Sequence, residues 1–445
     1  MNIKILILFI KMKKNDIIAI ILIALLITCL ILIGVLNKNE NYEKFNIKHS
    51  QSAFIRDGKT QKESFVNLRD PPILVPDGVT DNSPILLSLL QNLQNNVQFW
   101  KGGSISLDSG VYLFNSEVRF SYPQRGFSLS FLGKGQKVST LYFPNSNGIT
   151  LYLSRPDQSF HFNGLSFACG CDRGNNNWCQ TQDSCDIEQR GKYIGLSLSN
   201  PGWAEGNFDQ NDIQNCTFQG IEGGQSCNYW NTAIWIIGIC NINYYNLLIY
   251  GPGWDVQPNT YFGNGIIING PDNSKNNPST YVYSIVHNFQ MCSIYNLANG
   301  LIINDFVQGV TLNQCNIANG GIAIYSPANT IGVLSELAIT NSYFYCFLDQ
   351  IRILNTVDQI MITNNNFFVV ENNSGINLTN CVLFNIASNQ FTCTSGNNNS
   401  GTTGINLQNC SKGVINGNVF YCLQNPINFN NSDMTTILQN TNLSV

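Results

Sequence analysis

Gly375-Ile-Asn-Leu-Thr-Asn-Cys381 returns almost unchanged 29 residues later as Gly404-Ile-Asn-Leu-Gln-Asn-Cys410. A second signature is a phenylalanine that follows an Asn-containing turn, and its copies lie 23, 24 and 29 residues apart: Phe344, Phe367, Phe391 and Phe420. Short apolar runs such as Gly300-Leu-Ile-Ile-Asn304 fill the intervals. Such repetition indicates one small unit stacked many times, because a single unit of this size cannot bury its own apolar face.

The repeat predicts an all-β fold, the parallel β-helix. Each unit offers three short strands separated by Asn- and Gly-rich turns, and each strand would pair with its equivalent one coil later, about 4.8 Å along the axis. Inward Ile, Val, Phe and Cys then form the core, while stacked turn Asn side chains satisfy backbone groups. Leucine-rich repeats need regular Leu spacing and a helix, and propeller blades need about forty residues, so neither fits. Residues 140–440 have room for about twelve coils.

The N-terminal end of this body, which we place at 71–445, has its own pattern. Ser83-Pro84 and the Leu-rich run after it predict a short amphipathic helix with Ser83 as N-cap, ending by Asn95-Asn96. Residues 102–113 alternate apolar and polar residues around glycines, which predicts two short strands joined by a tight turn.

Residues 17–36 are uncharged and long enough to cross a bilayer as a helix. Because no good cleavage site follows them, we expect an uncleaved signal anchor rather than a cleaved signal peptide, with 1–16 as a short cytoplasmic tail and 37–70 as a polar stalk. Lysines flank the segment on both sides, so charge does not orient it. Fourteen of the 15 Cys follow it, which suits an oxidising compartment. The expectation is a single-pass membrane protein whose C-terminal domain is extracytoplasmic or on a virion surface.

Composition excludes some functions. Charged residues make up 11% of the chain, and 27 acidic residues exceed 23 basic ones, so there is no basic field for nucleic acid. The 65 Asn argue against a helical bundle. Seven Asn-x-Ser/Thr sequons would make the chain a glycoprotein if it is secreted, but roughly eight or nine are expected by chance from this composition, so their number has no weight.

The opening of the body resembles a known superfamily. The motifs are Asp77-Gly-Val-Thr-Asp81, the helix at 83–95, the glycine-rich strands at 102–113 and Phe131-Leu-Gly-Lys-Gly135. Together they are similar to the start of pectate-lyase-like right-handed parallel β-helix proteins, which include polysaccharide lyases, glycoside hydrolases and phage tailspikes. The resemblance implies a single-stranded right-handed β-helix with an N-terminal capping helix, and structural roles for Asp77 and Asp81. It is also compatible with a homotrimer, as in tailspikes, and leaves the activity open.

The sequence offers few candidate catalytic residues. Four segments that plant-type pectinases of this fold carry are missing, and with three His and few cations after residue 200 a lyase is disfavoured. A glycoside hydrolase needs only two carboxylates, and the candidates are Glu205, Asp209, Asp212 and Glu222. A carbohydrate site in the same region would use Trp203, Trp230, Trp254 and Asp255, because sugars stack on exposed indoles. The alternative is that these Trp residues pack loops onto the body. Excess acidic charge after residue 200 favours neutral or basic glycans.

Four closely spaced cysteines, Cys169, Cys171, Cys179 and Cys185, predict two local disulfides in a long insertion. Zinc is the alternative, but paired Cys-x-x-Cys spacing is lacking, so we expect no metal and no cofactor. The ten later cysteines are expected to be core residues with few disulfides.

Two functions remain open. The first is a membrane-anchored spike or adhesin that binds glycans or a surface partner protein, which overlaps with a structural virion or envelope component. The second is a membrane-tethered glycoside hydrolase.

Overall fold

The computed structural model describes most of the chain beyond residue 73. The described residues are 74–95, 102–122, 126–155, 157–170, 193–200, 210–221, 229–251, 262–271, 284–327, 335–356, 359–395 and 401–443. They all belong to one compact unit, Asn67–Val445.

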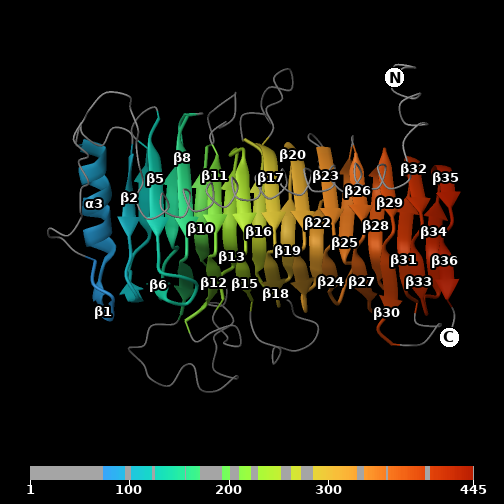
Figure 1. The fold of residues 1–445 in the computed structure, drawn as a ribbon, viewed down its shortest axis with the longest axis horizontal. Coiled ribbons are helices and arrows are strands. Elements are labelled where there is room, and N and C mark those ends of the chain that lie inside the picture. The colour runs from blue at the N-terminus through green and yellow to red at the C-terminus, as the bar shows by residue number, and fades with distance from the viewer. Residues whose placement is uncertain are drawn as a thin grey trace, which may run out of the picture. The chain divides into compact units, whose positions relative to one another are not determined.

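Three parallel sheets run along this unit, and each coil of chain contributes one strand to each sheet (Figure 1). Sheet A has 13 strands, sheet B 12 and sheet C 11. Apart from the first and last strand of each sheet, every strand pairs with the equivalent strands of the coils before and after it, as β28 pairs with β25 and β31. The predicted parallel β-helix is confirmed.

Sheet A contains β1 Asp77–Asp81, β3 Gly110–Leu113, β6 Ser139–Phe143, β9 Ser166–Cys169, β12 Thr217–Gly220, β15 Leu248–Tyr250, β18 Ser293–Tyr295, β21 Asn316–Ala318, β24 Tyr343–Tyr345, β27 Asn366–Val369, β30 Gln390–Cys393, β33 Val419–Tyr421 and β36 Thr441–Leu443. Sheet B contains β2 Gly102–Ser106, β5 Ser128–Leu132, β8 Ser159–Asn163, β11 Asn211–Gln214, β14 Ile242–Tyr245, β17 Ser284–Gln290, β20 Val307–Asn313, β23 Ser335–Thr340, β26 Ile360–Thr363, β29 Phe384–Ala387, β32 Ser411–Asn416 and β35 Asp433–Leu438. Sheet C contains β4 Val118–Ser121, β7 Ile149–Tyr152, β10 Ile194–Ser199, β13 Thr232–Ile237, β16 Asn264–Asn269, β19 Asn299–Ile303, β22 Ile322–Ser326, β25 Ile351–Thr356, β28 Ser374–Cys381, β31 Thr403–Gln408 and β34 Asn425–Asn430.

The repeats in the sequence correspond to stacks in the structure. Ile376 and Leu378 of β28 lie in register with Ile405 and Leu407 of β31, and all four side chains are fully buried. The four recurring phenylalanines form one ladder whose neighbouring ring centroids are 5.1, 4.8 and 5.0 Å apart. Alternate residues of each strand point into this core, so the residues between them form the outer faces of the sheets.

Asparagine supports the corner between sheets B and A. Asn215, Asn246 and Asn341 occupy it with positive φ, a backbone conformation that Asn tolerates better than most residues. The next residue of later coils points inward and forms a second ladder, in which the Asn389 side chain accepts from the Asn365 amide at 2.9 Å and donates to the Ile362 carbonyl at 2.8 Å. The predicted role of turn Asn in satisfying backbone groups is confirmed.

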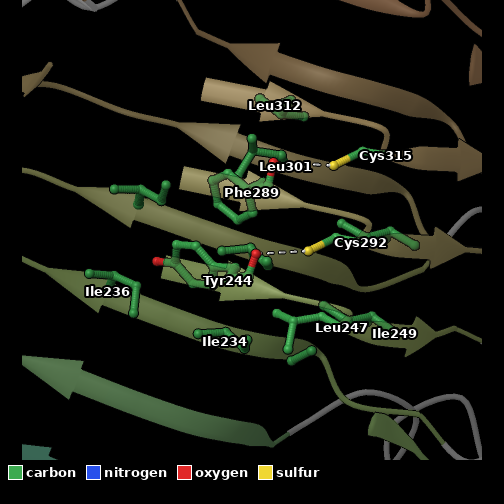
Figure 2. Close-up of a cluster of buried hydrophobic side chains, with 14 of the residues drawn as sticks. Ile234, Ile236, Tyr244, Leu247, Ile249, Phe289, Cys292, Leu301, Leu312 and Cys315 are labelled. Atoms are coloured by element: carbon green, nitrogen blue, oxygen red, sulfur yellow. Dashed lines mark hydrogen bonds between the residues drawn. The ribbon is translucent and has the colours of Figure 1, made fainter. Parts of the chain in front are cut away.

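Cysteines fill the same inward corner position in earlier coils. Cys292 and Cys315 lie beside the stacked rings of Tyr244 and Phe289, and their thiols donate to the carbonyls of those two residues at 3.5 and 3.7 Å (Figure 2). Burial raises the pKa of Cys216, in the same corner, to about 12, so its thiol stays protonated. The expectation that the later cysteines are core residues is confirmed for those that the structure describes.

Helix α3, Ser83–Asn95, covers the first coil, as predicted (Figure 1). Its buried face is Leu86, Leu89, Leu90 and Leu93. The N-cap is Asn82 rather than the predicted Ser83, because the Asn82 carbonyl accepts the first helical N–H, from Leu86, at 2.9 Å. The two predicted strands at 102–113 are β2 and β3, and they enter different sheets rather than pairing with each other.

Asp77 and Asp81 have the structural roles that were expected. The Asp77 carboxylate accepts the Val79 and Thr80 amides at 2.8 and 2.7 Å. The Asp81 carboxylate accepts the Ser83 amide at 2.9 Å and the Asn115 amide at 3.1 Å. Both therefore hold the turns that lead into the first coil.

The predicted localisation as a single-pass membrane protein requires correction. Within the described ranges no helix is long and apolar enough to cross a bilayer, and α3 has 13 residues where about 20 are needed. The segment 17–36 lies outside the described residues, as do the predicted tail 1–16 and stalk 37–70.

Candidate functional site

The outer face of sheet C carries a continuous row of large and polar side chains. Trp235, Ile267, Ile302, Tyr325, Arg352, Asn377, Asn406 and Asn428 lie in register from β13 to β34. We call these residues the sheet C row. Seven are half-buried and Asn428 is exposed, whereas their neighbours along the strands, such as Ile234 and Ile236, belong to the core.

The first half of the sheet C row is apolar and aromatic. Its borders are polar, because Asn299 donates to Asn264 at 2.9 Å on one side and Asn304 donates to Asn269 at 2.6 Å on the other. The Trp235 indole Nε1 is buried and has no hydrogen-bond partner among the described residues, whereas the side chain as a whole is half-buried. This half of the row therefore offers aromatic surface next to amide groups.

Its second half is built on a buried carboxylate. The Asp349 Oδ2 atom accepts from Arg352 Nε at 2.8 Å and from Asn377 Nδ2 at 2.9 Å, while Oδ1 accepts the Ser374 amide at 2.9 Å. These contacts fix the guanidinium plane and balance its charge. The two terminal guanidinium nitrogens have no partner among the described residues and can donate to a ligand.

Asparagines extend the row toward the C-terminus. Asn406 donates to Asn377 at 3.2 Å, and Asn428 donates to Asn406 at 2.9 Å. Each of these side-chain amides can still donate and accept further hydrogen bonds, so this part of the row presents one amide group per coil.

Most of the site residues predicted from the sequence lie in segments next to sheet C strands along the chain. Trp203, Glu205 and Asp209 follow β10, Glu222 precedes β13, and Trp254 and Asp255 precede β16. All six lie outside the described residues.

Trp230 is described and does not reach the surface. Its side chain is 1% exposed, its Nε1 donates to the Phe167 carbonyl at 3.2 Å, and its ring meets Phe143 edge-on with centroids 6.3 Å apart. This is the packing role that the sequence left as the alternative, and Trp230 is not part of the sheet C row.

Asp212 lies on a different face. It is in β11 of sheet B, where Oδ2 is 3.1 Å from His161 Nδ1 and Oδ1 accepts from Asn243 Nδ2 at 3.2 Å. Burial opposes ionisation of the carboxyl, but hydrogen bonds from His161, Asn243 and Gln210 outweigh it, so the pKa of Asp212 lies below its ordinary value. Because it is ionised, the Asp212 carboxylate can accept hydrogen bonds but is poorly suited to be the proton-donating acid of a glycoside hydrolase.

Of the four cysteines assigned to local disulfides, the structure describes Cys169. It ends β9, is buried, and its thiol is 3.6 Å from the Gln219 carbonyl. Cys171, Cys179 and Cys185 lie outside the described residues, so their pairing stays a prediction.

The sequence analysis did not single out Trp235, Tyr325 or Arg352. A signal was available, because aligning Gly265-Ile-Ile-Ile-Asn269 with Gly300-Leu-Ile-Ile-Asn304 assigns the middle residue of each strand to the outer face. Extending that alignment to β13, β22 and β25 would have found all three residues.

The chain has only distant similarity to known proteins. No family model matches the sequence, and no curated protein matches it. Solved structures match at 8–12% identity. ORF18 of Geobacillus virus E2 matches at 12% identity over 84% of this chain with a TM-score of 0.37. The Dettilon tailspike protein gp208 matches at 10% over 82% with a TM-score of 0.47, and the A-module of the Azotobacter vinelandii mannuronan C-5 epimerase AlgE6 at 12% over 83% with a TM-score of 0.36. The chain spans 60%, 66% and 97% of those three chains. The parallel β-helix that the resemblance implied is borne out by the three parallel sheets of the structure.

Proposed function

We propose that this chain is a glycan-binding β-helix protein of the spike or adhesin type, and that its ligand lies on the sheet C row. The observation that carries the proposal is the continuity of the row, in which aromatic, guanidinium and amide side chains face outward from consecutive coils. Such a combination of apolar surface with a few fixed polar groups is typical of ligand sites.

The geometry suits a polymer. Coils repeat about every 4.8 Å, so equivalent side chains recur at intervals close to the length of one sugar ring. Trp235 and Tyr325 offer ring faces or edges to the apolar side of sugars, while Asn377 and Asn406 offer amides to hydroxyl groups. The parallel sheets hold these groups in place, which lowers the entropy lost on binding.

The charges favour a neutral glycan. Arg352 is the one cation of the sheet C row, and the buried Asp349 carboxylate already balances it. The row therefore has no net positive charge to attract uronic acids or sulfate groups. Trp203, Trp254 and Asp255 remain proposed contacts from the neighbouring segments.

The test is binding of the full chain to a panel of neutral and acidic polysaccharides, with mass spectrometry of the products. Trp235→Ala and Tyr325→Ala are each expected to weaken binding by about tenfold or more, the effect of an interface anchor. Tyr245→Ala is the matched control, because Tyr245 is a 37% exposed aromatic on sheet B. Unchanged binding in both sheet C variants would contradict the proposed site, and shortened polysaccharide would make the protein a hydrolase.

A further inference from the structure

A serine, a histidine and an aspartate lie in one row on the outer face of sheet B. In combination, these three residue types can perform nucleophilic catalysis. Ser130 of β5 is in register with His161 of β8, and His161 is in register with Asp212 of β11. All three point outward, because Leu129, Phe131, Phe162 and Ile213, which alternate with them, are in the core. The row comes from three consecutive coils and lies on a different sheet from the proposed glycan site.

The histidine is held in one tautomer. A carboxylate can only accept hydrogen bonds, so the 3.1 Å contact to Asp212 Oδ2 requires a proton on His161 Nδ1. In the neutral ring Nε2 is then the free base. Asn243 fixes the other carboxylate oxygen at 3.2 Å, so the carboxylate is oriented from both sides.

The spacing fits a relay along the row. Ser130 and Asp212 are two coils apart, and two inter-strand steps of about 4.8 Å accommodate an imidazole ring with a hydrogen bond at each end. The ring is bonded to Asp212 on one side, and Ser130 is its row neighbour on the other.

Ser130 is available as a nucleophile. Its side chain is half-buried and its hydroxyl makes no hydrogen bond in the part of the chain that the structure describes. Ser128 of the same strand differs, because its hydroxyl accepts from Ser159 at 2.9 Å. On the other side of Ser130 the row continues with Ser104, whose hydroxyl could donate to an oxyanion.

We propose that Ser130, His161 and Asp212 form an acyl-transfer site that hydrolyses carboxylic esters. The Ser130 oxygen forms a bond to the ester carbonyl carbon, and His161 Nε2 takes the hydroxyl proton. The C–O bond to the alcohol breaks, and the alcohol leaves with that proton. Water then attacks the acyl-serine and gives its proton to His161, which returns it to Ser130 as the acid leaves. Ser130 and His161 are the catalytic residues, and Asp212 is a positioning residue.

The face is an open sheet, so the site takes esters that are accessible on a larger molecule or small activated esters. This activity does not depend on glycan binding by sheet C. The strand amides of the described residues are engaged in the sheets, so they leave no pair of backbone donors for the oxyanion, and turnover is expected to be slow.

The test uses the full chain with a fluorophosphonate and with p-nitrophenyl acetate. Labelling is expected on Ser130, located by peptide mapping. His161→Gln should slow labelling by about 100-fold or more, as expected for loss of a general base. Asp212→Asn should do the same and move the ring proton to Nε2 in ¹⁵N NMR spectra, and Asp212→Glu should restore part of the rate. Ser128→Ala is the matched control and should react like the native chain.

Three results would overturn the proposal in variants whose circular dichroism is native. The first is absence of label on Ser130. The second is hydrolysis that survives Ser130→Ala, which would make the imidazole the nucleophile. The third is an Asp212→Asn variant with an unchanged His161 tautomer and rate.

Discussion

Acid should destabilise the β-helix through one buried histidine. His287 of β17 has no exposed surface, and its ring lies between the Tyr244 hydroxyl, 3.3 Å from Nδ1, and the Ser284 hydroxyl, 2.9 Å from Nε2. Ser284 also donates to the Ile239 carbonyl, so Nε2 carries the proton and Nδ1 accepts from Tyr244. The neutral ring is fully satisfied, and burial lowers the pKa of His287 from 6.5 to about 3.

The sign and size of the effect follow from that pKa. Above pH 6.5 the ring is neutral in both the folded and the unfolded chain, so it adds no pH dependence. Between pH 6.5 and about 3 only the unfolded chain takes up the proton, and the free energy of unfolding falls by about 1.4 kcal/mol per pH unit. The full loss reaches about 5 kcal/mol near pH 3.

The assay is urea unfolding of the native chain and of His287→Gln at half-unit steps from pH 7 to pH 4. Carboxyl groups with lowered pKa, such as Asp77 and Asp212, contribute equally to both proteins, so the difference in slope isolates His287. Below pH 6, unfolding of His287→Gln should take up one proton fewer than unfolding of the native chain. His49→Gln serves as the control for replacement of a histidine outside the described residues. Identical slopes in the native chain and His287→Gln would refute the reasoning.

Other expectations concern the core and the assembly. Phe367→Ala should cost about 3–5 kcal/mol in urea unfolding, because the fully buried ring stacks between two others, whereas the half-exposed Phe368→Ala should cost less. Asn389→Ala should cost about 2–4 kcal/mol, because it leaves two buried backbone groups of the preceding coil without partners, and the outward Asn385→Ala should be nearly neutral. Light scattering of the purified chain checks the homotrimer that the tailspike resemblance suggests, and a monomeric mass would rule it out.

The coil architecture was predictable because stacking leaves a direct record in the sequence. Side chains at equivalent positions are neighbours in space, so the Phe ladder could be read from spacings of 23, 24 and 29 residues. The covering helix was predictable for a similar reason, since its Leu face follows a helical period.

The candidate sites were harder to predict. His161 and Asp212 are 51 residues apart, and the long connections between them hide that they occupy adjacent coils. Trp235 lies in Thr232–Ile237, a strand with apolar residues on both faces, so no alternation distinguishes its outward position from that of its buried neighbours. Trp230 could not be separated from Trp203 and Trp254 by residue type alone, because an indole serves equally in a core and on a surface.

Coil length varies much more than coil geometry. Along sheet B, residues in successive coils that hydrogen-bond to each other are 51, 31, 45 and 23 positions apart, yet the corner between sheets B and A keeps one residue with positive φ in coil after coil. Length differences are therefore absorbed at the two corners that flank sheet C. An insertion or deletion there alters the borders of the sheet C row without shifting any strand out of register. Whole loops can accordingly be replaced at these two corners while the stacked coils keep their pairing.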